Sequence, residues 1–150
     1  MAAAVRRAEV VWEGDLMSGS GRVSTRSSPA LRDQPVSWAA RTEDPGGKTS
    51  PEELVAAAHA SCFSMALSAN LAKRRAPPTR LEVTATVTFD KVGAGFKVIS
   101  SALEVRGTVP GLEGAAFQTA AEEAKEGCPI SQMMKGNVEL SVKATLAGGA

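Results

Sequence analysis

The chain has 150 residues, which is enough for one domain with its own hydrophobic core. Its formal net charge is +1 and only 4% of its residues are aromatic. This composition argues against a basic nucleic-acid-binding surface and against the aromatic platform of a single-strand binder. The N-terminal segment lacks the apolar core of a secretory signal, and no run reaches the roughly 18 uninterrupted apolar residues of a membrane span. We therefore expect a cytoplasmic protein that binds neither nucleic acid nor a membrane.

The first third of the chain predicts short strands joined by turns. Residues 5–12 and 22–26 flank a glycine-containing turn region, and this pattern predicts an N-terminal hairpin. We expect a further short strand over residues 36–41. Residues 42–48 are rich in Gly, Pro and Asp, which indicates a loop that leads into a helix.

Residues 49–75 predict one long helix of roughly 24 residues, on the order of 36 Å in length. Ser50 suits the N-cap, Pro51 suits the first helical position, and Glu53 completes an S-x-x-E capping box. Two prolines at 77–78 end the helix. Most of its residues are small or apolar, which is typical of a buried helix that other segments approach closely.

The second half of the chain predicts strands and helices in runs rather than in strict alternation, which is typical of an α+β fold. No repeat and no long linker divides the chain, so we expect one domain over residues 1–150. The expected elements are strands over 81–89 and 96–109, the latter with a β-bulge near Ser100 and Ser101, a helix over 112–126, a short helix over 129–135 and a strand over 138–146.

Two cysteines, Cys62 and Cys128, are the first candidates for chemistry. They lie too far apart in the sequence for a C-x-x-C motif or a zinc-finger spacing, and with one histidine in the chain we expect no metal site. The simplest interpretation is two small core residues, because free cysteine is among the most buried residue types. Against it, Cys128 precedes Pro129 at the expected start of a helix, where unpaired backbone N–H groups lower the pKa of a thiol.

Cys62 lies well inside its helix, so a reactive thiolate there needs another cation. Arg41 precedes the helix by a loop with two glycines and is a candidate, and Glu52 in the first turn is a natural partner to orient its guanidinium. The alternatives are an ordinary surface pair or no contact. From these residues alone, Cys128 rather than Cys62 would be the more acidic thiol.

Two further polar residues invite a catalytic interpretation that we do not favour. His59 lies three residues before Cys62 and is placed to act as a base, but a lone helical histidine is more often a packed polar residue. Ser131 has neither a second histidine nor a G-x-S-x-G elbow to support a serine nucleophile.

The chain resembles the osmotically inducible protein C and organic hydroperoxide resistance family. The segments that carry the resemblance are TSPEELVAAAHASCFSMALS (49–68) and EGCPISQMMKGNVEL (126–140). VVWEGDLMSGSGRVST (10–25) and VTFDKVGAGFKV (87–98) resemble the N-terminal and central hairpins of the family. The chain is more similar to the osmotically inducible branch, because a Gln usually follows the matching Glu in the other branch.

The resemblance implies a peroxiredoxin-like organic hydroperoxide reductase. Cys62 matches the peroxidatic cysteine and Cys128 the resolving cysteine, which reverses the ranking reached from the helix dipole. Arg41 falls where the family places the arginine that stabilises the thiolate and the peroxide, and Glu52 matches the carboxylate that orients it. The family fold implies an intertwined homodimer, with long central helices wrapped by antiparallel β-sheets and active sites at the subunit interface.

The implied cycle passes through a Cys62 sulfenic acid and a Cys62–Cys128 disulfide, with no bound cofactor. An external dithiol, which the resemblance suggests is a dihydrolipoyl group on a lipoylated protein, restores the thiols. We expect an apolar pocket with Met65, Met133 and Met134 as candidates, which would favour alkyl or fatty-acid hydroperoxides. The alternatives are a hydroperoxide-sensing or ligand-binding homodimer with little turnover, and a structural dimer with inert cysteines.

Overall fold

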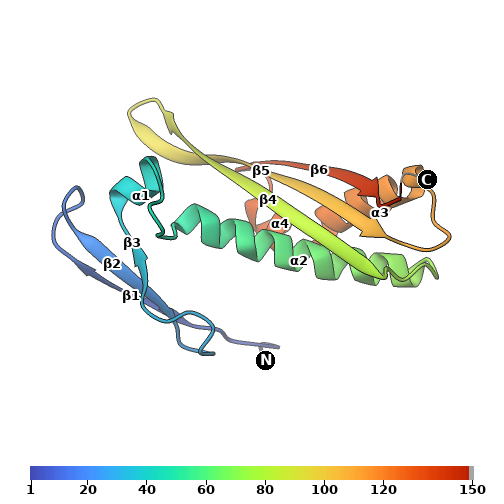
Figure 1. Cartoon of the computed structure of the whole chain (residues 1–150), viewed down its shortest axis with the longest axis horizontal. Helices are drawn as coiled ribbons and strands as arrows, with labels where there is room; N and C mark the ends of the chain where they lie inside the picture. The colour runs from blue at the N-terminus through green and yellow to red at the C-terminus, as the bar shows by residue number, and fades with distance from the viewer. Residues whose placement is uncertain (149–150) are drawn as a thin grey trace. The chain divides into compact units, whose positions relative to one another are not determined.

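A computed structural model describes residues 1–148 of the chain. It divides the chain into two compact units, Met1–Leu54 and Val55–Ala150, and each unit has its own three-stranded sheet (Figure 1). Strands and helices follow one another in runs, which confirms the α+β class. The single domain over residues 1–150 stays a prediction.

The N-terminal unit contains an antiparallel sheet and a short helix. Strands β1 (Ala8–Glu13), β2 (Ser20–Thr25) and β3 (Gln34–Val36) pair in the order β1-β2-β3, which confirms the predicted hairpin. The strand predicted over residues 36–41 is wrong, because the helix α1 (Trp38–Thr42) begins there. Ser37 has an extended backbone and its hydroxyl accepts the Ala40 N–H at 3.1 Å, so this serine acts as the N-cap.

The long helix α2 (Pro51–Lys73) has 23 residues, as predicted. The Ser50 hydroxyl accepts the Glu53 N–H at 3.1 Å, which is the expected N-cap contact. The other half of the capping box is wrong: the Glu53 carboxylate accepts the Thr49 hydroxyl at 2.7 Å instead of the Ser50 N–H.

The C-terminal unit contains the strands β4 (Arg80–Val92), β5 (Gly95–Thr108) and β6 (Glu139–Leu146) in the order β4-β5-β6. β4 and β5 form an antiparallel pair, whereas β6 is parallel to β5. The helices α3 (Gly114–Gly127) and α4 (Pro129–Met134) supply the crossover that a parallel pair requires. Thr88 pairs with Ser100 and Phe89 with Val98, so Ile99 is the extra residue of a bulge beside the predicted position.

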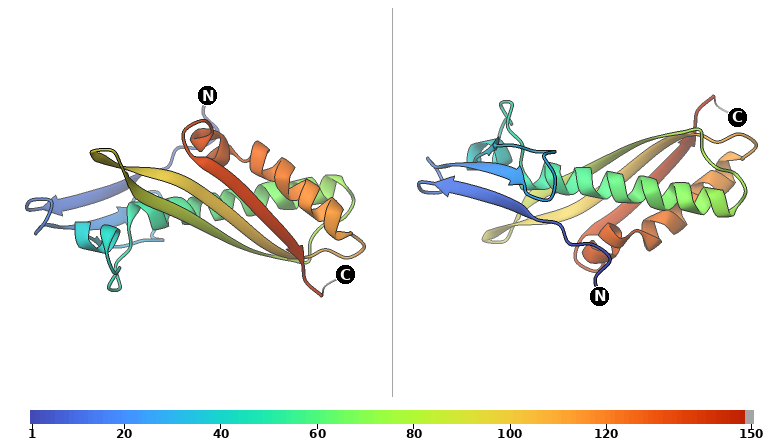
Figure 2. Two further views of the ribbon diagram at one scale, coloured as in Figure 1. Left: turned by 90° about the horizontal axis from the view of Figure 1, so that it is seen from above. Right: turned by 90° about the horizontal axis from the view of Figure 1, so that it is seen from below.

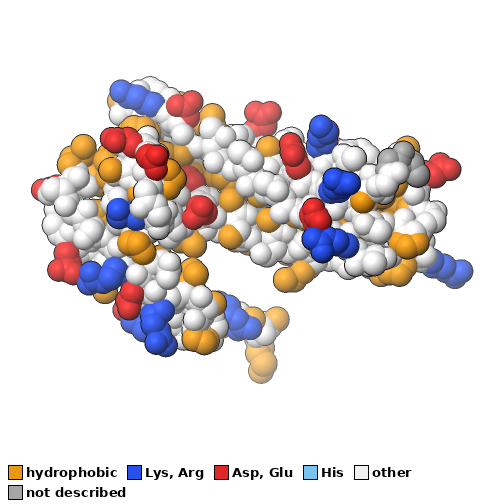
Figure 3. All heavy atoms as spheres, in the orientation of Figure 1, with side chains coloured by type: hydrophobic (Ala, Val, Ile, Leu, Met, Phe, Trp, Pro, Cys, Tyr) orange, Lys and Arg blue, Asp and Glu red, His pale blue; other side chains and the backbone are white. Residues whose placement is uncertain are grey.

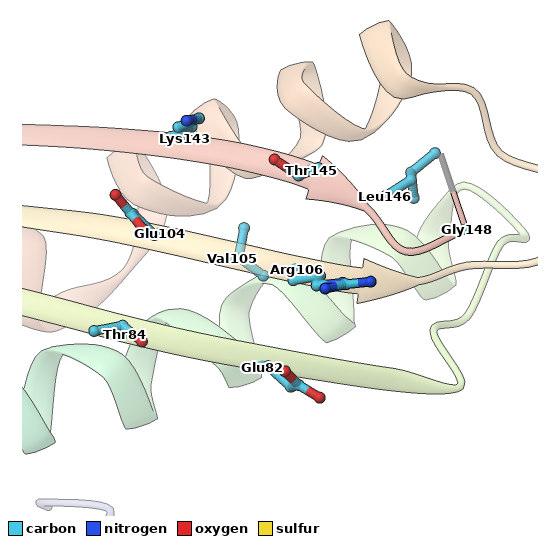
Figure 4. Close-up of a pocket in the computed structure, with 9 residues that line it drawn as sticks. All are labelled: Glu82, Thr84, Glu104, Val105, Arg106, Lys143, Thr145, Leu146 and Gly148. Carbon is cyan, nitrogen blue, oxygen red and sulfur yellow. The ribbon is translucent and has the colours of Figure 1, made fainter. Parts of the chain in front are cut away.

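Helices α2 and α3 cover one face of the β4-β5-β6 sheet (Figures 1 and 2). Every fourth residue of α2 from His59 to Leu71 is buried. These positions form one face of a helix, and the apolar ones pack in a core with Leu103, Val105 and Phe117. The opposite face of the sheet carries charges of both signs (Figure 3). A polar hollow of about 520 Å³ lies there, and neither cysteine lines it. Figure 4 shows its lining residues Glu82, Thr84, Glu104, Val105, Arg106, Lys143, Thr145, Leu146 and Gly148.

The remaining surface of α2 is exposed within the single chain. Only 22% of its most apolar 18-residue stretch is buried within the described residues. By length and composition alone α2 is apolar enough to cross a membrane, a criterion that the core helix of a water-soluble protein also meets. The expectation of a fully buried helix is therefore wrong for the single chain, because α2 uses one face for the core and leaves another uncovered.

Candidate active site

Arg41 and Glu52 form an ion pair with several hydrogen bonds in the N-terminal unit. The Arg41 Nε donates to Glu52 Oε1 at 3.0 Å and to Oε2 at 3.1 Å, and Nη2 donates to Oε1 at 2.8 Å. Glu52 is only 8% exposed, and the Arg41 guanidinium carbon lies 5.9 Å from the centre of the Trp38 ring. The burial and the fork-like geometry exclude an ordinary surface pair and fix the direction of the guanidinium.

An apolar pocket of about 360 Å³ includes Arg41 in its wall. No sequence pattern predicted this pocket, although both tryptophans of the chain line it. Its lining residues are Val10, Trp12, Leu16, Val23, Val36, Ser37, Trp38, Arg41, Pro51 and Leu54.

The pocket expected from the methionines is not formed in the single chain. Met65 and Met133 are 71% and 70% exposed, and Met134 is buried in the C-terminal unit. The apolar lining comes instead from aromatic and aliphatic residues of the N-terminal sheet, α1 and the first turn of α2.

The two cysteines meet in the C-terminal unit as free thiols. Cys128 is fully buried in the core cluster, and the partly buried Cys62 packs against that cluster. Burial raises the pKa of Cys62, and the hydrogen-bonded Cys128 side chain raises it further. The backbone N–H of Ile130 donates to the Cys62 sulfur and acts in the opposite direction.

The backbone N–H of Ile130 at the start of α4 is thus directed at Cys62. Cys128 is the N-cap of α4, but within residues 1–148 its side chain makes no capping hydrogen bond. Pro129 has no N–H, so Ile130 is the first residue of the helix with a donor to offer. The chain fold directs this donor at the other cysteine.

His59 is a packed polar residue, as we expected. Its Nδ1 lies 2.6 Å from the Ser101 hydroxyl and its Nε2 lies 2.7 Å from the Ser131 hydroxyl. Burial lowers the pKa of His59, so the imidazole is neutral near pH 7. Ser131 is only 1% exposed, which leaves no access for a substrate of a serine nucleophile. No sequence pattern pointed to Ser101, because this strand residue and the helix residue His59 meet only in the folded unit.

The described residues contain no group of three or more His, Cys, Asp or Glu side chains arranged to hold a metal ion. The chemistry available is thus that of two thiols in contact, one backbone donor on Cys62, and a guanidinium oriented by a buried carboxylate.

The OsmC-like protein family model matches residues 44–143 of the chain. The chain belongs to this family. Peroxiredoxin OsmC of Escherichia coli (strain K12) is 44% identical over 135 residues, which cover 90% of this chain and 93% of that protein. The Organic hydroperoxide resistance protein of Xanthomonas axonopodis pv. citri (strain 306) is 32% identical over 98 residues, which cover 65% of this chain and 67% of that protein. The greater similarity to the osmotically inducible branch is confirmed.

Solved structures confirm the OsmC-like fold. An organic hydroperoxide resistance protein OsmC from Legionella pneumophila matches with a TM-score of 0.75 at 23% identity, covering 97% of this chain and 99% of that one. Organic Hydroperoxide Resistance Protein OhrB of Bacillus subtilis matches with a TM-score of 0.71 at 26% identity, covering 93% of this chain and 98% of that one.

Proposed function

We propose that this OsmC-like protein is a cysteine-based peroxidase that reduces organic hydroperoxides to alcohols. Relatives named as a peroxiredoxin and as organic hydroperoxide resistance proteins support a peroxidase-type enzyme with a role in hydroperoxide defence. The observation that carries the finer proposal is the contact between the thiols of Cys62 and Cys128, since a peroxidatic thiol needs a second thiol to form a disulfide.

In the first step the Cys62 thiolate attacks the terminal oxygen of the hydroperoxide. The O–O bond breaks, the alkoxide takes a proton and leaves as an alcohol, and Cys62 becomes a sulfenic acid. Arg41, oriented by Glu52, stabilises the thiolate and polarises the O–O bond in this proposal. A cation is needed because burial disfavours the charged form of Cys62.

In the second step the Cys128 thiol attacks the Cys62 sulfur, a disulfide forms and water leaves. An external dithiol then reduces this disulfide by thiol–disulfide exchange and leaves as its own disulfide. We propose a dihydrolipoyl group, carried by a lipoylated protein, as this dithiol. The cysteine sulfurs supply two electrons to the hydroperoxide and the external dithiol returns two electrons to them, so the cycle needs no bound cofactor.

The apolar pocket beside Arg41 supports an alkyl or fatty-acid hydroperoxide as substrate. Its lining is almost entirely aliphatic and aromatic, and Arg41 is its one charged lining residue among those described. An acyl or alkyl chain gains from leaving water in such a pocket, whereas hydrogen peroxide has no apolar surface to bury.

We propose that the protein acts as an intertwined homodimer in the cytoplasm. An exposed stripe of small and apolar residues runs along one face of α2. We propose that a second copy of the chain packs against this stripe. The stripe consists of Ala58, Ser61, Met65, Ser68, Ala69 and Ala72. Light scattering coupled to gel filtration should give twice the chain mass, and a monomer at micromolar concentration would contradict the dimer.

The first experiment is a thiol count before and after one equivalent of cumene hydroperoxide, with an intact mass of the product. We expect the loss of both thiols and a mass lower by two hydrogens, with no oxygen added. Cys62→Ser should consume no peroxide. Two unreacted thiols in the wild-type protein would refute the proposal.

One observation favours a hydroperoxide-sensing or ligand-binding dimer as the second candidate. Burial and the neighbouring Cys128 both raise the pKa of Cys62, and a thiol that is mostly protonated reacts slowly. Steady-state consumption of cumene hydroperoxide with dihydrolipoamide separates the two, because a sensor reacts once and an enzyme continues to turn over.

A further inference from the structure

Three buried polar side chains form a hydrogen-bonded series beside the cysteine pair. The His59 imidazole lies between the hydroxyls of Ser101 and Ser131, at 2.6 Å and 2.7 Å. All three residues are 0–1% exposed. Burying polar groups costs free energy unless they form hydrogen bonds. Each of these three side chains therefore depends on the others for its hydrogen bonds in an otherwise apolar core.

The series connects the same two helices as the thiols do. His59 lies one turn before Cys62 on α2, and Ser131 lies one turn after Cys128 at the start of α4. Residues three apart on a helix are neighbours on its surface. The two helices therefore meet in two adjacent contacts, one between thiols and one between an imidazole and a hydroxyl.

We propose that the His59–Ser131 hydrogen bond is a positioning contact that holds α4 against α2, so that Cys128 and the Ile130 N–H both reach the Cys62 sulfur. Its role in turnover rests on the proposed function, in which Cys128 resolves the Cys62 sulfenic acid. We assign His59 a positioning role because the residue is fully buried and both of its ring nitrogens contact serine hydroxyls.

The short helix α4 needs such a contact. It has only six residues, and a helix of this length has little stability of its own. Apolar packing resists separation of the helices but tolerates sliding, whereas a hydrogen bond of 2.7 Å fixes one atom of α4 relative to one atom of α2.

Ser101 fixes the imidazole from the other side. It lies on β5, the central strand of the sheet, and its hydroxyl meets Nδ1. A neutral imidazole has one donor and one acceptor nitrogen, so one serine accepts a hydrogen bond and the other donates one. The two hydrogen bonds fix the orientation of the ring, so that its Nε2 points at the Ser131 hydroxyl on α4.

Equilibrium with glutathione tests the proposal without peroxide. Two protein thiols and one oxidised glutathione give the Cys62–Cys128 disulfide and two reduced glutathiones, and the equilibrium constant is the effective concentration of the two thiols. Ser131→Ala should lower this value about tenfold, which corresponds to the loss of about one hydrogen bond. The pH midpoint of Cys62 alkylation should also rise, because the Ile130 N–H would no longer be held on the sulfur.

Two substitutions of His59 separate positioning from general stability. The Asn amide occupies the place of Nδ1 and faces Ser101, whereas the Gln amide reaches the place of Nε2 and faces Ser131. We expect His59→Asn to behave like Ser131→Ala and His59→Gln to retain the effective concentration within about threefold. Leu71→Ala is the control: it removes a buried side chain from α2, should lower Tm by the usual cost of a core cavity, and should leave the effective concentration unchanged.

Wild-type effective concentrations in Ser131→Ala overturn the proposal, as does a loss in Leu71→Ala of the same size. If His59→Asn fails to fold, Ser131→Ala alone decides. A wild-type protein that closes its disulfide with oxidised glutathione but consumes no cumene hydroperoxide would refute the proposed function and leave this positioning role standing.

Discussion

Glu52 should be far more important for stability and activity than any other carboxylate paired with an arginine in the N-terminal unit. Its carboxylate accepts three hydrogen bonds from Arg41, and its side chain is 9% exposed against 30% for Arg41. Removing one partner of a fully buried pair costs about 3–5 kcal/mol. Because water reaches part of Arg41, we expect Glu52→Ala to lower the free energy of unfolding by about 2–3 kcal/mol, a fall in Tm of about 5–10 °C.

Glu13→Ala is the matched control, since Glu13 also pairs with an arginine in the same unit. Arg22 Nη2 lies 2.9 Å from Glu13 Oε1, but these side chains are 49% and 67% exposed, so the expected loss is below about 0.5 kcal/mol. Thermal unfolding gives the stabilities, and cumene hydroperoxide reduction gives kcat/KM. We expect kcat/KM to fall about 10- to 100-fold in Glu52→Ala only. Equal effects of the two substitutions would refute the reasoning.

Cys128→Ser should allow one oxidation of Cys62 that stops at the sulfenic acid, seen as a mass gain of one oxygen; continued turnover with a dithiol would show that Cys128 is not required. Gly107→Ala should lower the free energy of unfolding by about 1–3 kcal/mol, because a Cβ there would lie 2.5 Å from Phe117 Cζ; Phe117→Leu should recover part of the loss in urea melts. Burial holds the folded pKa of His59 below its unfolded value, so the unfolded chain binds the extra proton and stability falls as pH drops through about 6.5. His59→Gln should flatten this part of the urea-derived stability profile between pH 7.5 and 5.5, and an unchanged slope would exclude His59 as its source.

The fold was largely predictable because local signals agreed with one another. The capped start of α2 and the two-residue alternation of β4 and β6 are visible in the sequence, and the structure places these elements as expected. The failure at Ser37 has a clear cause. A short apolar segment fits a strand or a helix equally well, and only the N-cap contact with Ala40 decides for α1.

The candidate site was predictable only as far as sequence neighbours reach. Arg41 and Glu52 were placed together from one loop and one helix start, and the structure pairs them. Contacts between distant elements gave no such signal: Ser101 is 42 residues from His59, and the Ile130 donor serves Cys62 rather than the adjacent Cys128. Such pairings depend on how β5 and α4 pack against α2, which no local pattern reports.

Magnitudes favour Arg41 over the helix end as the source of a Cys62 thiolate. A helix N-terminus stabilises a negative charge by about 0.3–1 kcal/mol at an exposed site, and α4 is short and contributes one N–H to the sulfur. A guanidinium about 4 Å from a thiolate contributes about 4 kcal/mol at an effective dielectric constant near 20, which corresponds to about three pKa units. Burial and Cys128 both raise the pKa of Cys62, and of the two stabilising effects the guanidinium opposes this rise with the larger magnitude. The proposed mechanism therefore assigns stabilisation of the Cys62 thiolate to Arg41, and it assigns the alignment of the sulfur with Cys128 to the His59–Ser131 contact.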